Sequence, residues 1–282
     1  MIKLQDVTKR YGNSTAIDHI SINLEDNKIY CLLGCNGAGK TTLMKMIAGH
    51  INASGGSIEV DGKLVNTAQM PDTVSFIENR AAQFNTKLNN LIHMASELDS
   101  GFNRAFAFRM TKKFHLDTDK KIRQLSFGMQ TMFNTLLSLA SNRKIILLDE
   151  PLLGLDAIMR NKFYNLLNDS FENYPRTIML STHLIDEMTK SAEELIILDK
   201  GKVILRSTIN DIDEKAYSIT GAAGAIVPVL KNLNVISSKT IGEHTTAYIF
   251  DEQPEIPAAL AVQSVGLQEF FINLVGGDFD EE

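Results

Sequence analysis

Residues 34–42 have the types and spacing that bind phosphate. They read GCNGAGKTT and satisfy the phosphate-binding pattern G-x-x-x-x-G-K-[ST]. Glycine lets backbone N–H groups turn toward an anion without a side chain in the way, and the start of a helix adds partial positive charge. Lys40 should reach the β- and γ-phosphates, and the Thr41 hydroxyl should ligate Mg²⁺. The residues expected to hold a nucleoside triphosphate are Asn36, Gly37, Ala38, Gly39, Lys40, Thr41 and Thr42.

Two adjacent carboxylates, Asp149 and Glu150, follow an apolar run at 145–148. A strand buried on both faces delivers Asp149 to the carboxyl edge of a parallel sheet, where such sheets bind ligands. Asp149 is suited to hold Mg²⁺ through its water shell. Glu150 lies one residue further, toward the γ-phosphate, where it can polarise an attacking water. The alternative is that an acid here caps the following helix.

The elements that position these residues indicate an α/β core. The phosphate pattern follows an apolar run at 29–33 and precedes a helical pattern that starts near Leu43. The runs at 145–148 and 177–180 are also continuously apolar, as buried parallel strands are, and a helical segment separates them. Alternating helices and apolar strands around a phosphate loop predict a parallel sheet.

Other segments differ from this pattern. Residues 2–7 and 20–24 alternate apolar and polar side chains, as antiparallel strands with one solvated face do. Residues 74–77 read as another strand, and the pattern from Leu88 to about Leu139 is helical. A closing strand, turn and strand are expected between 195 and 205.

Composition narrows the possible partners. The chain has 282 residues, 44% of them hydrophobic, and a formal net charge of −6, which argues against a nucleic-acid binder. Its two cysteines, Cys31 and Cys35, are expected to be reduced thiols of a cytosolic protein, with a redox role for Cys35 as the alternative. No apolar stretch approaches the roughly 20 residues of a membrane span. We therefore expect any work at a membrane to go through a partner.

The composition shifts beyond about Glu214. Glycine and alanine cluster at 221–224, and three prolines follow within a short distance. Short strands are predicted at 235–236 and 247–250, and a helix at 267–274. We interpret residues 214–282 as a small α+β accessory domain.

A second segment, LSFGM at 125–129, gives the phosphate loop a family context. It resembles the signature Leu-Ser-Gly-Gly-Gln of ATP-binding cassette (ABC) proteins. It occurs together with Tyr11, with the turn 154–156 and with His183 after a strand. The resemblance covers roughly residues 1–213. It implies an ABC-type P-loop ATPase core with a parallel sheet, an antiparallel β subdomain and a helical subdomain at about 84–140.

The resemblance also implies a site shared between two subunits. Ser126 and the backbone N–H of Gly128 would bind the γ-phosphate of an ATP held by the opposite subunit. Asp156 would lie at the interface between the two subunits and make each ATP site respond to the state of the other. Two ATP molecules would thus close a dimer and hydrolysis would release it. The second ATPase subunit could be identical or homologous.

Two further roles follow from the resemblance. Tyr11 would stack on the adenine, an aromatic face against a base; the alternative is a core tyrosine at a strand end. His183 would contact the γ-phosphate and position water together with Glu150. The alternative for His183 is a surface histidine in a turn.

The chain departs from the family pattern at several positions. Phe127 replaces a small signature residue, Met129 replaces the glutamine, and Leu153 stands where a small polar residue is usual. The family also has a glutamine after the strand at 74–77 that touches Mg²⁺ and the membrane subunit. We favour Asn79 for that role, with Glu78 as the second choice. The alternative is that both are plain surface residues of a loop.

The implied function is that of an ABC transporter ATPase subunit. It would bind ATP and Mg²⁺ and attach to the cytoplasmic face of the cell membrane through an integral membrane subunit. The ending LQEFFINL, the segment LSFGM and the length most resemble ATPases of bacterial ABC-2-type exporters of amphipathic peptides, antibiotics or lantibiotics, such as the phenol-soluble modulin exporters of staphylococci. The alternatives are a soluble ABC ATPase, acting for example in iron–sulfur assembly, and a nucleotide sensor with negligible turnover.

Overall fold

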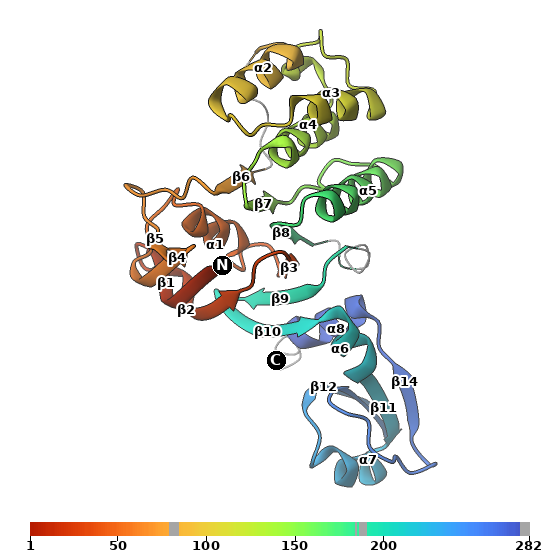
Figure 1. The fold of residues 1–282 in the computed structure, drawn as a ribbon. Coiled ribbons are helices and arrows are strands. Elements are labelled where there is room, and N and C mark those ends of the chain that lie inside the picture. Colours follow the sequence, from red (N-terminus) through yellow and green to blue (C-terminus); the bar gives the residue numbers. More distant parts are fainter. Residues whose placement is uncertain (79–84, 184, 186–190, 277–282) are drawn as a thin grey trace. The chain divides into compact units, whose positions relative to one another are not determined.

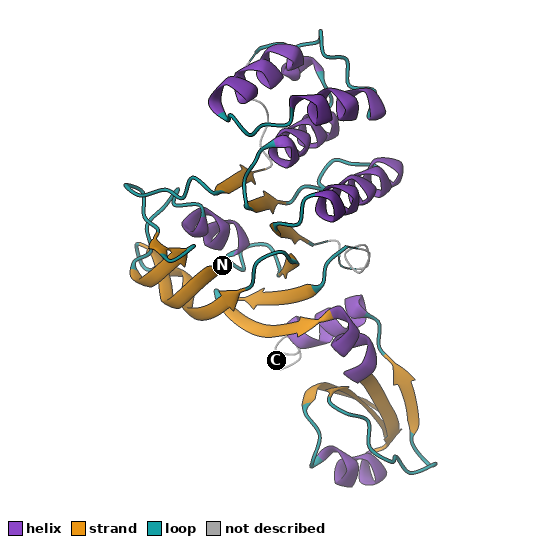
Figure 2. Ribbon diagram, in the orientation of Figure 1, coloured by secondary structure: helices purple, strands orange, loops and turns teal. Residues whose placement is uncertain are grey.

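The strand that leads into the phosphate loop lies inside a six-stranded sheet (Figures 1 and 2). The structure is a computed structural model of the chain, and it describes residues 1–78, 85–183, 185 and 191–276. The strand order is β10-β9-β3-β8-β7-β6. The strands are β3 (Ile29–Leu33), β6 (Val74–Glu78), β7 (Ile145–Asp149), β8 (Thr177–Thr182), β9 (Glu194–Asp199) and β10 (Lys202–Thr208).

The predicted parallel sheet is confirmed. Strand β3 pairs in parallel with β8 and β9, and β7 pairs in parallel with β6 and β8. Every residue of β3, β7 and β8 is buried, which explains why these segments are continuously apolar rather than alternating. The carboxyl ends of β3, β7 and β8 therefore meet at one edge of the sheet.

A second sheet has the order β2-β1-β4-β5, and its neighbouring strands pair antiparallel. Its strands are β1 (Ile2–Tyr11), β2 (Ser14–Leu24), β4 (Gly55–Val60) and β5 (Lys63–Leu64). Strands β1 and β2 run further than the alternation at 2–7 and 20–24 suggests. The reason is a shift of register between Leu4 and Val7, with positive φ at Asp6 (51°) and His19 (52°). These bulges interrupt the alternation while the pairing continues.

Helix α1 (Lys40–Ile47) packs its apolar face into the core that joins the two sheets. Met44 and Ile47 of this helix are fully buried, together with Ile2 and Ile17 of the antiparallel sheet and Leu147 of the parallel sheet. The helix begins directly after the phosphate loop, so this packing fixes the loop against both sheets.

The helical region predicted for 88–139 forms separate helices above the edge strand β6 (Figure 1). They are α2 (Leu88–Leu98), α3 (Arg104–Lys113), a short 3₁₀ turn (Ile122–Gln124) and α4 (Phe127–Ala140), while α5 (Ala157–Asn173) follows β7. The break before α3 has a local cause, since the Asn103 side chain accepts a hydrogen bond from the Phe106 N–H at 2.9 Å. Among the described residues, no helix has the length and apolar content that crossing a membrane requires.

The described residues separate into two compact units, and the second contains residues 207–276 together with Ile185. Its sheet has the order β12-β13-β11-β14 and is antiparallel. The core contains Tyr217, Ile219 and Ile249. The elements are α6 (Ile209–Lys215), β11 (Ala216–Ala222), α7 (Ala223–Leu230), β12 (Val235–Ile241), β13 (His244–Phe250), β14 (Ala261–Ser264) and α8 (Leu267–Gly276).

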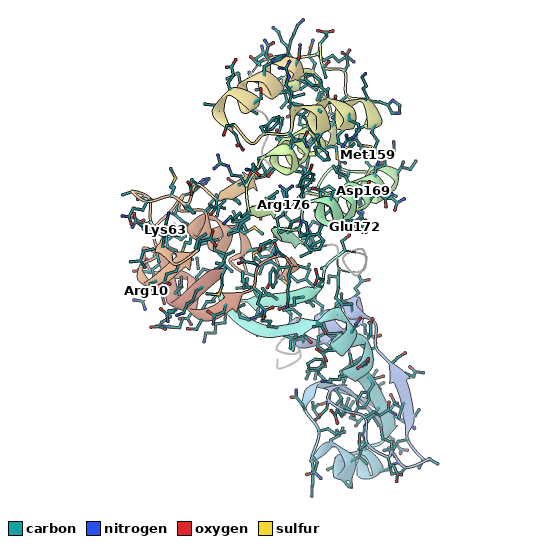
Figure 3. All side chains as sticks on the ribbon, in the orientation of Figure 1. Arg10, Lys63, Met159, Asp169, Glu172 and Arg176 are labelled. Carbon is teal, nitrogen blue, oxygen red and sulfur yellow. The ribbon has the colours of Figure 1, made fainter. Side chains whose placement is uncertain are left out.

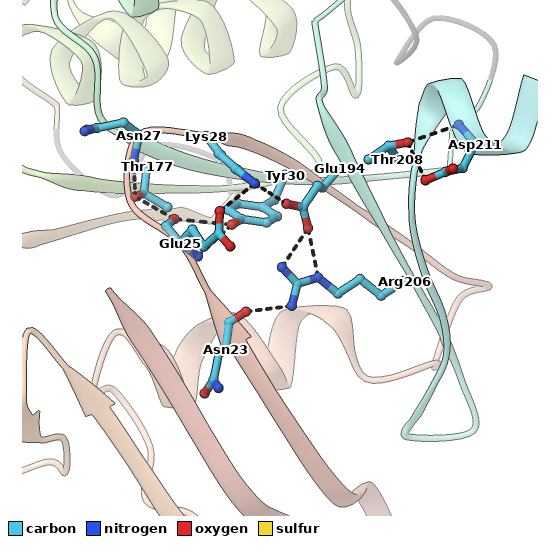
Figure 4. Close-up of polar contacts among 10 residues, drawn as sticks. All are labelled: Asn23, Glu25, Asn27, Lys28, Tyr30, Thr177, Glu194, Arg206, Thr208 and Asp211. Atoms are coloured by element: carbon cyan, nitrogen blue, oxygen red, sulfur yellow. Dashed lines mark hydrogen bonds and ion pairs between the residues drawn. The ribbon is translucent and has the colours of Figure 1, made fainter.

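A network of ion pairs joins the strands at the sheet edge opposite the phosphate loop (Figure 4). Glu194 accepts hydrogen bonds from Lys28 Nζ at 2.7 Å and from Arg206 Nε at 2.8 Å. Arg206 Nη1 also donates to the Asn23 carbonyl oxygen at 2.7 Å. Burial works against ionisation of Glu194, yet the bonds from Lys28 and Arg206 hold its pKa below the ordinary value. The network therefore stabilises the ionised form of this carboxylate.

Candidate active site: a phosphate loop beside two carboxylates

The phosphate loop has the close backbone contacts that its glycines predict. A Cβ on Gly34 would lie 2.5 Å from the Leu198 carbonyl oxygen, and a Cβ on Gly39 would lie 2.5 Å from the Ala16 carbonyl oxygen. Gly39 also has φ = 108°, a conformation that L side chains rarely adopt. The loop thus has no room for side chains at these positions, and its backbone can approach an anion directly.

Lys40 opens helix α1 with its ammonium turned back toward the loop. The ammonium donates to the carbonyl oxygens of Gly34 (2.6 Å) and Cys35 (3.3 Å). Its Nζ also lies 3.8 Å from Glu150 Oε1, and the Lys40 side chain is only 7% exposed. The loop therefore holds a buried positive charge within reach of a carboxylate, where a phosphate can compete for it.

Thr41 and Asp149 meet although they are far apart in the sequence. The Thr41 hydroxyl donates to Asp149 Oδ2 at 2.7 Å. The other oxygen, Asp149 Oδ1, accepts from the Ser181 hydroxyl at 2.6 Å. This contact arises because Asp149 and Ser181 stand opposite each other in the parallel pair β7–β8. A hydroxyl and a fixed carboxylate are the oxygen donors that Mg²⁺ prefers, so the residues present fit this ion.

Glu150 is held by its backbone and by its side chain. Its N–H donates to the Ser181 hydroxyl at 2.9 Å, and its φ is 50°. Its Oε2 lies 2.9 Å from His183 Nδ1. The side chain is 20% exposed, against 48% for His183. A partly buried carboxylate beside an imidazole and an ammonium can take a proton from a bound water.

The structure excludes the alternative that Asp149 or Glu150 caps the following helix. Helix α5 is capped by Asp156, whose Oδ1 accepts from the Met159 N–H at 2.8 Å. Asp149 and Glu150 therefore do not cap this helix, and their carboxylates are directed to Thr41, Ser181, Lys40 and His183 instead.

Ser126, Gly128 and Asp156 lie at the starts of two helices. The Ser126 hydroxyl caps α4 by accepting from the Met129 N–H at 3.3 Å. Gly128 packs against Gly154, since a Cβ on Gly128 would lie 2.3 Å from the Gly154 carbonyl oxygen. Within one chain, then, the segment 125–129 touches the turn that precedes Asp156.

Tyr11 ends strand β1 and is 52% exposed, so it is not a core tyrosine. Lys9 Nζ lies 5.1 Å from the centre of its ring. About half of the Tyr11 side chain is therefore accessible to a partner.

Asn79 lies outside the described residues, but its neighbour Glu78 is the last residue of β6. Glu78 stands opposite Asp149 in the parallel pair β6–β7. Its Oε1 accepts from Lys45 Nζ at 2.8 Å, and Lys45 belongs to helix α1. This pair places one more carboxylate at the edge that carries the phosphate loop.

Sequence reasoning gave no role to Ser181 or Lys45. The signal for Ser181 is weak, because a serine near the end of a buried strand becomes informative only when the neighbouring strand is known.

Both cysteines are free thiols, and burial followed by the charge of Glu150 raises the pKa of the Cys31 thiol. Cys31 is therefore a neutral core residue.

The chain is similar to known ATP-binding proteins. The ABC transporter family model matches residues 17–153. The lantibiotic transport ATP-binding protein SrtF of Streptococcus pyogenes is 30% identical over 207 residues, which are 73% of this chain and 90% of SrtF. The taurine import ATP-binding protein TauB of Shigella dysenteriae is 30% identical over 216 residues, 74% of this chain and 85% of TauB. A dimeric, post-hydrolysis structure of the ATP-binding cassette MJ0796 with ADP and Pi is 25% identical, covers 74% of this chain and 98% of that chain, and has a TM-score of 0.64.

Proposed function

We propose that this chain, which belongs to the ABC transporter family and is an ATP-binding, ATP-hydrolysing subunit, drives the export of an amphipathic peptide or peptide antibiotic. The observation that carries the hydrolytic part is the contact of Glu150 with both Lys40 and His183 at the mouth of the phosphate loop. The direction and the cargo rest on likeness to relatives such as SrtF, named for lantibiotic transport.

Hydrolysis uses the groups described above. The loop N–H groups and the Lys40 ammonium neutralise the phosphates, so Lys40 exchanges its bonds to the Gly34 and Cys35 carbonyls for the ligand. Thr41 and Asp149 would hold Mg²⁺, which supplies positive charge to the β- and γ-phosphate oxygens when bound. Glu150 accepts a proton from the water whose oxygen bonds to the γ-phosphorus. The bond between the γ-phosphorus and the β–γ bridging oxygen breaks, and ADP and phosphate are released.

Ser181 and His183 position Glu150 for this reaction. Ser181 accepts from the Glu150 N–H and donates to Asp149, so one hydroxyl fixes the base and the carboxylate for the metal ion relative to each other. His183 holds one carboxylate oxygen and leaves the other near Lys40. This arrangement sets the direction in which Glu150 can accept a proton.

We further propose that hydrolysis takes place between two ATPase subunits. The cap residues Ser126 and Asp156 and the N–H of Gly128 would complete the site of the opposite subunit, and Tyr11 would stack on the adenine of its own. The dimeric structure of the similar cassette MJ0796, with ADP and Pi, supports this arrangement. The partner subunit can be a second copy or a homologue.

We propose an integral membrane subunit as the other partner, with this chain on the cytoplasmic face of the membrane. A groove of about 520 Å³ runs along residues 74–77 of β6. It combines apolar side chains, Phe76 and Phe102, with charged ones, Asp99 and Arg143. A mixed lining of this kind suits an amphipathic helix.

Affinity purification of the full chain from detergent-solubilised membranes of its own host tests this proposal. We expect one integral membrane protein to co-purify, and the ATPase rate of the complex to respond when candidate peptides are added. Recovery of the ATPase without any membrane protein would exclude the transporter role. Import of the peptide into inverted vesicles would confirm export, because the cytoplasmic face of such vesicles is outside.

A further inference from the structure

The start of helix α4 and the turn after strand β7 touch through their backbones. A Cβ on Gly128 would lie 2.3 Å from the Gly154 carbonyl oxygen and 3.0 Å from its carbonyl carbon. Real Cβ atoms essentially never come this close to other atoms, and carbonyl backbone cannot move aside as a flexible side chain does. The two segments therefore pack without any intervening side chain at this point.

The ring of Phe127 extends this contact. A Cβ on Gly154 would lie 2.8 Å from Phe127 Cδ1, and Gly154 has φ = 80°. Both the space and the backbone conformation thus require glycine opposite the ring. Phe127 is 38% exposed and Leu153, beside Gly154, is 45% exposed, so the contact with Gly154 covers only part of the Phe127 side chain.

The turn that Phe127 touches starts at Glu150. The Leu153 N–H donates to the Glu150 carbonyl oxygen at 3.2 Å, and the Leu155 N–H donates to the Leu152 carbonyl oxygen at 3.1 Å. These two bonds close consecutive turns between Glu150 and Leu155, which include Gly154. The Phe127 ring therefore touches a turn that is continuous with the backbone of Glu150.

The C-terminal ends of helices α4 and α5 are connected through the side chain of Arg176. Arg176, labelled in Figure 3, is only 7% exposed. Its Nη1 donates to the carbonyl oxygen of Ser141, which ends α4, at 3.0 Å. Its Nε donates to the carbonyl oxygen of Tyr174, which ends α5, at 3.3 Å. Arg176 thus connects the C-terminal ends of helices α4 and α5, while Gly128 at the start of α4 touches the turn that leads into α5.

We propose that Phe127 is a positioning residue that links Ser126 and Gly128, which close over the ATP of the other subunit, to Glu150 of its own chain. When α4 shifts on closure, the ring presses on Gly154 and sets the backbone of Glu150 for its own ATP. Because Phe127 is larger than the small residue of the family signature, it makes a closer contact with Gly154. The inference rests on the proposed two-subunit function, because the shift of α4 requires the second ATP.

A series at position 127 tests the link in the full-length chain. Phe127→Tyr keeps the ring, Phe127→Leu keeps part of the contact, and Phe127→Ala removes it. We expect kcat for ATP to fall along this series, to about one tenth in Phe127→Ala, with KM within about twofold of wild type. In a Glu150→Gln background, Phe127→Ala should form as much ATP-dependent dimer as Glu150→Gln alone. A merely structural role would lower the melting temperature without this separation of kcat from KM and from dimerisation.

Two results would overturn the inference. One is a kcat that does not change from Tyr to Leu to Ala; the Tyr and Leu variants alone decide this if the Ala variant does not fold. The other is a loss of ATP-dependent dimer that parallels the loss of kcat, which would make Phe127 an interface residue. Failure of Glu150→Gln itself to dimerise with ATP would instead remove the two-subunit function, and this inference with it.

Discussion

Glu150 Oε2 and His183 Nδ1 lie 2.9 Å apart, at the carboxyl ends of the neighbouring strands β7 and β8. The positive φ of Glu150 and its N–H bond to Ser181 hold the carboxylate in place from the backbone side. The base is therefore oriented from two directions before any ligand binds.

Replacement of His183 should slow hydrolysis without preventing ATP binding. His183→Ala removes the group that holds Glu150 Oε2, and we expect kcat to fall by about a hundredfold, within the range found for positioned acid–base groups. ATP affinity, measured by calorimetry, should change little because Lys40 and the loop remain. An unchanged kcat in His183→Ala would show that the contact with Glu150 has no part in hydrolysis.

Ser181→Ala should weaken the binding of Mg²⁺ at the site. The variant loses the bond to Asp149 at 2.6 Å and the bond from the Glu150 N–H at 2.9 Å. We expect the Mg²⁺ concentration for half-maximal ATPase activity to rise about 10- to 100-fold, as for other residues that orient metal ligands. Ser138→Ala is the matched control, because this buried hydroxyl bonds Ser75 outside the site. Equal effects of the two variants would contradict the role of Ser181.

Glu78 and Asn79 can be distinguished by the same assay. Glu78 stands opposite Asp149 and pairs with Lys45, so we expect Glu78→Gln to change the Mg²⁺ dependence of ATP binding. Asn79→Ala should change it less. The charge is the tested property, and Lys45→Gln should shift the dependence in the same assay because it removes the ammonium that donates to Glu78 Oε1. A large effect of Asn79→Ala alone would instead favour Asn79, the first choice made from the sequence.

The Glu194 network predicts how stability depends on pH. The pKa of Glu194 is held below its ordinary value of 4.5, so its ionised form stabilises the fold above that pH. The contribution disappears as pH falls through the lowered value. Thermal melts should therefore show a smaller loss between pH 5 and pH 3 in Glu194→Gln than in wild type, together with a lower melting temperature at pH 7. Parallel curves for the two proteins would contradict this.

The sequence predicted those parts of the site that lie within one local pattern. Residues 34–42, Asp149 and Glu150 were identified because each motif includes the strand that positions it. The contact of Thr41 with Asp149 joins residues far apart in the chain and follows from the sheet order β3-β8-β7, which no local pattern encodes. The bond from Ser181 to Asp149 depends on the same adjacency, and so sequence reasoning missed it.

The fold was predicted unevenly for similar reasons. Continuous apolar runs gave the parallel strands, because burial on both faces leaves a strong signal. Strand β11 and helix α7 were missed because alanine and glycine at 221–225 resemble a linker, although Ile226 packs into the core of the second unit. Strands β1 and β2 were predicted too short because their bulges break the alternation.

The central claim is that two subunits close over ATP and that Glu150 then cleaves it. Glu150→Gln keeps the phosphate contacts and removes the base, so the closed state should accumulate. The decisive measurement is the mass of Glu150→Gln by size-exclusion chromatography with light scattering, in ATP and Mg²⁺. We predict a dimer that is absent without ATP and absent when Lys40→Ala is added. A monomer under all these conditions, with ATP bound, would contradict the claim.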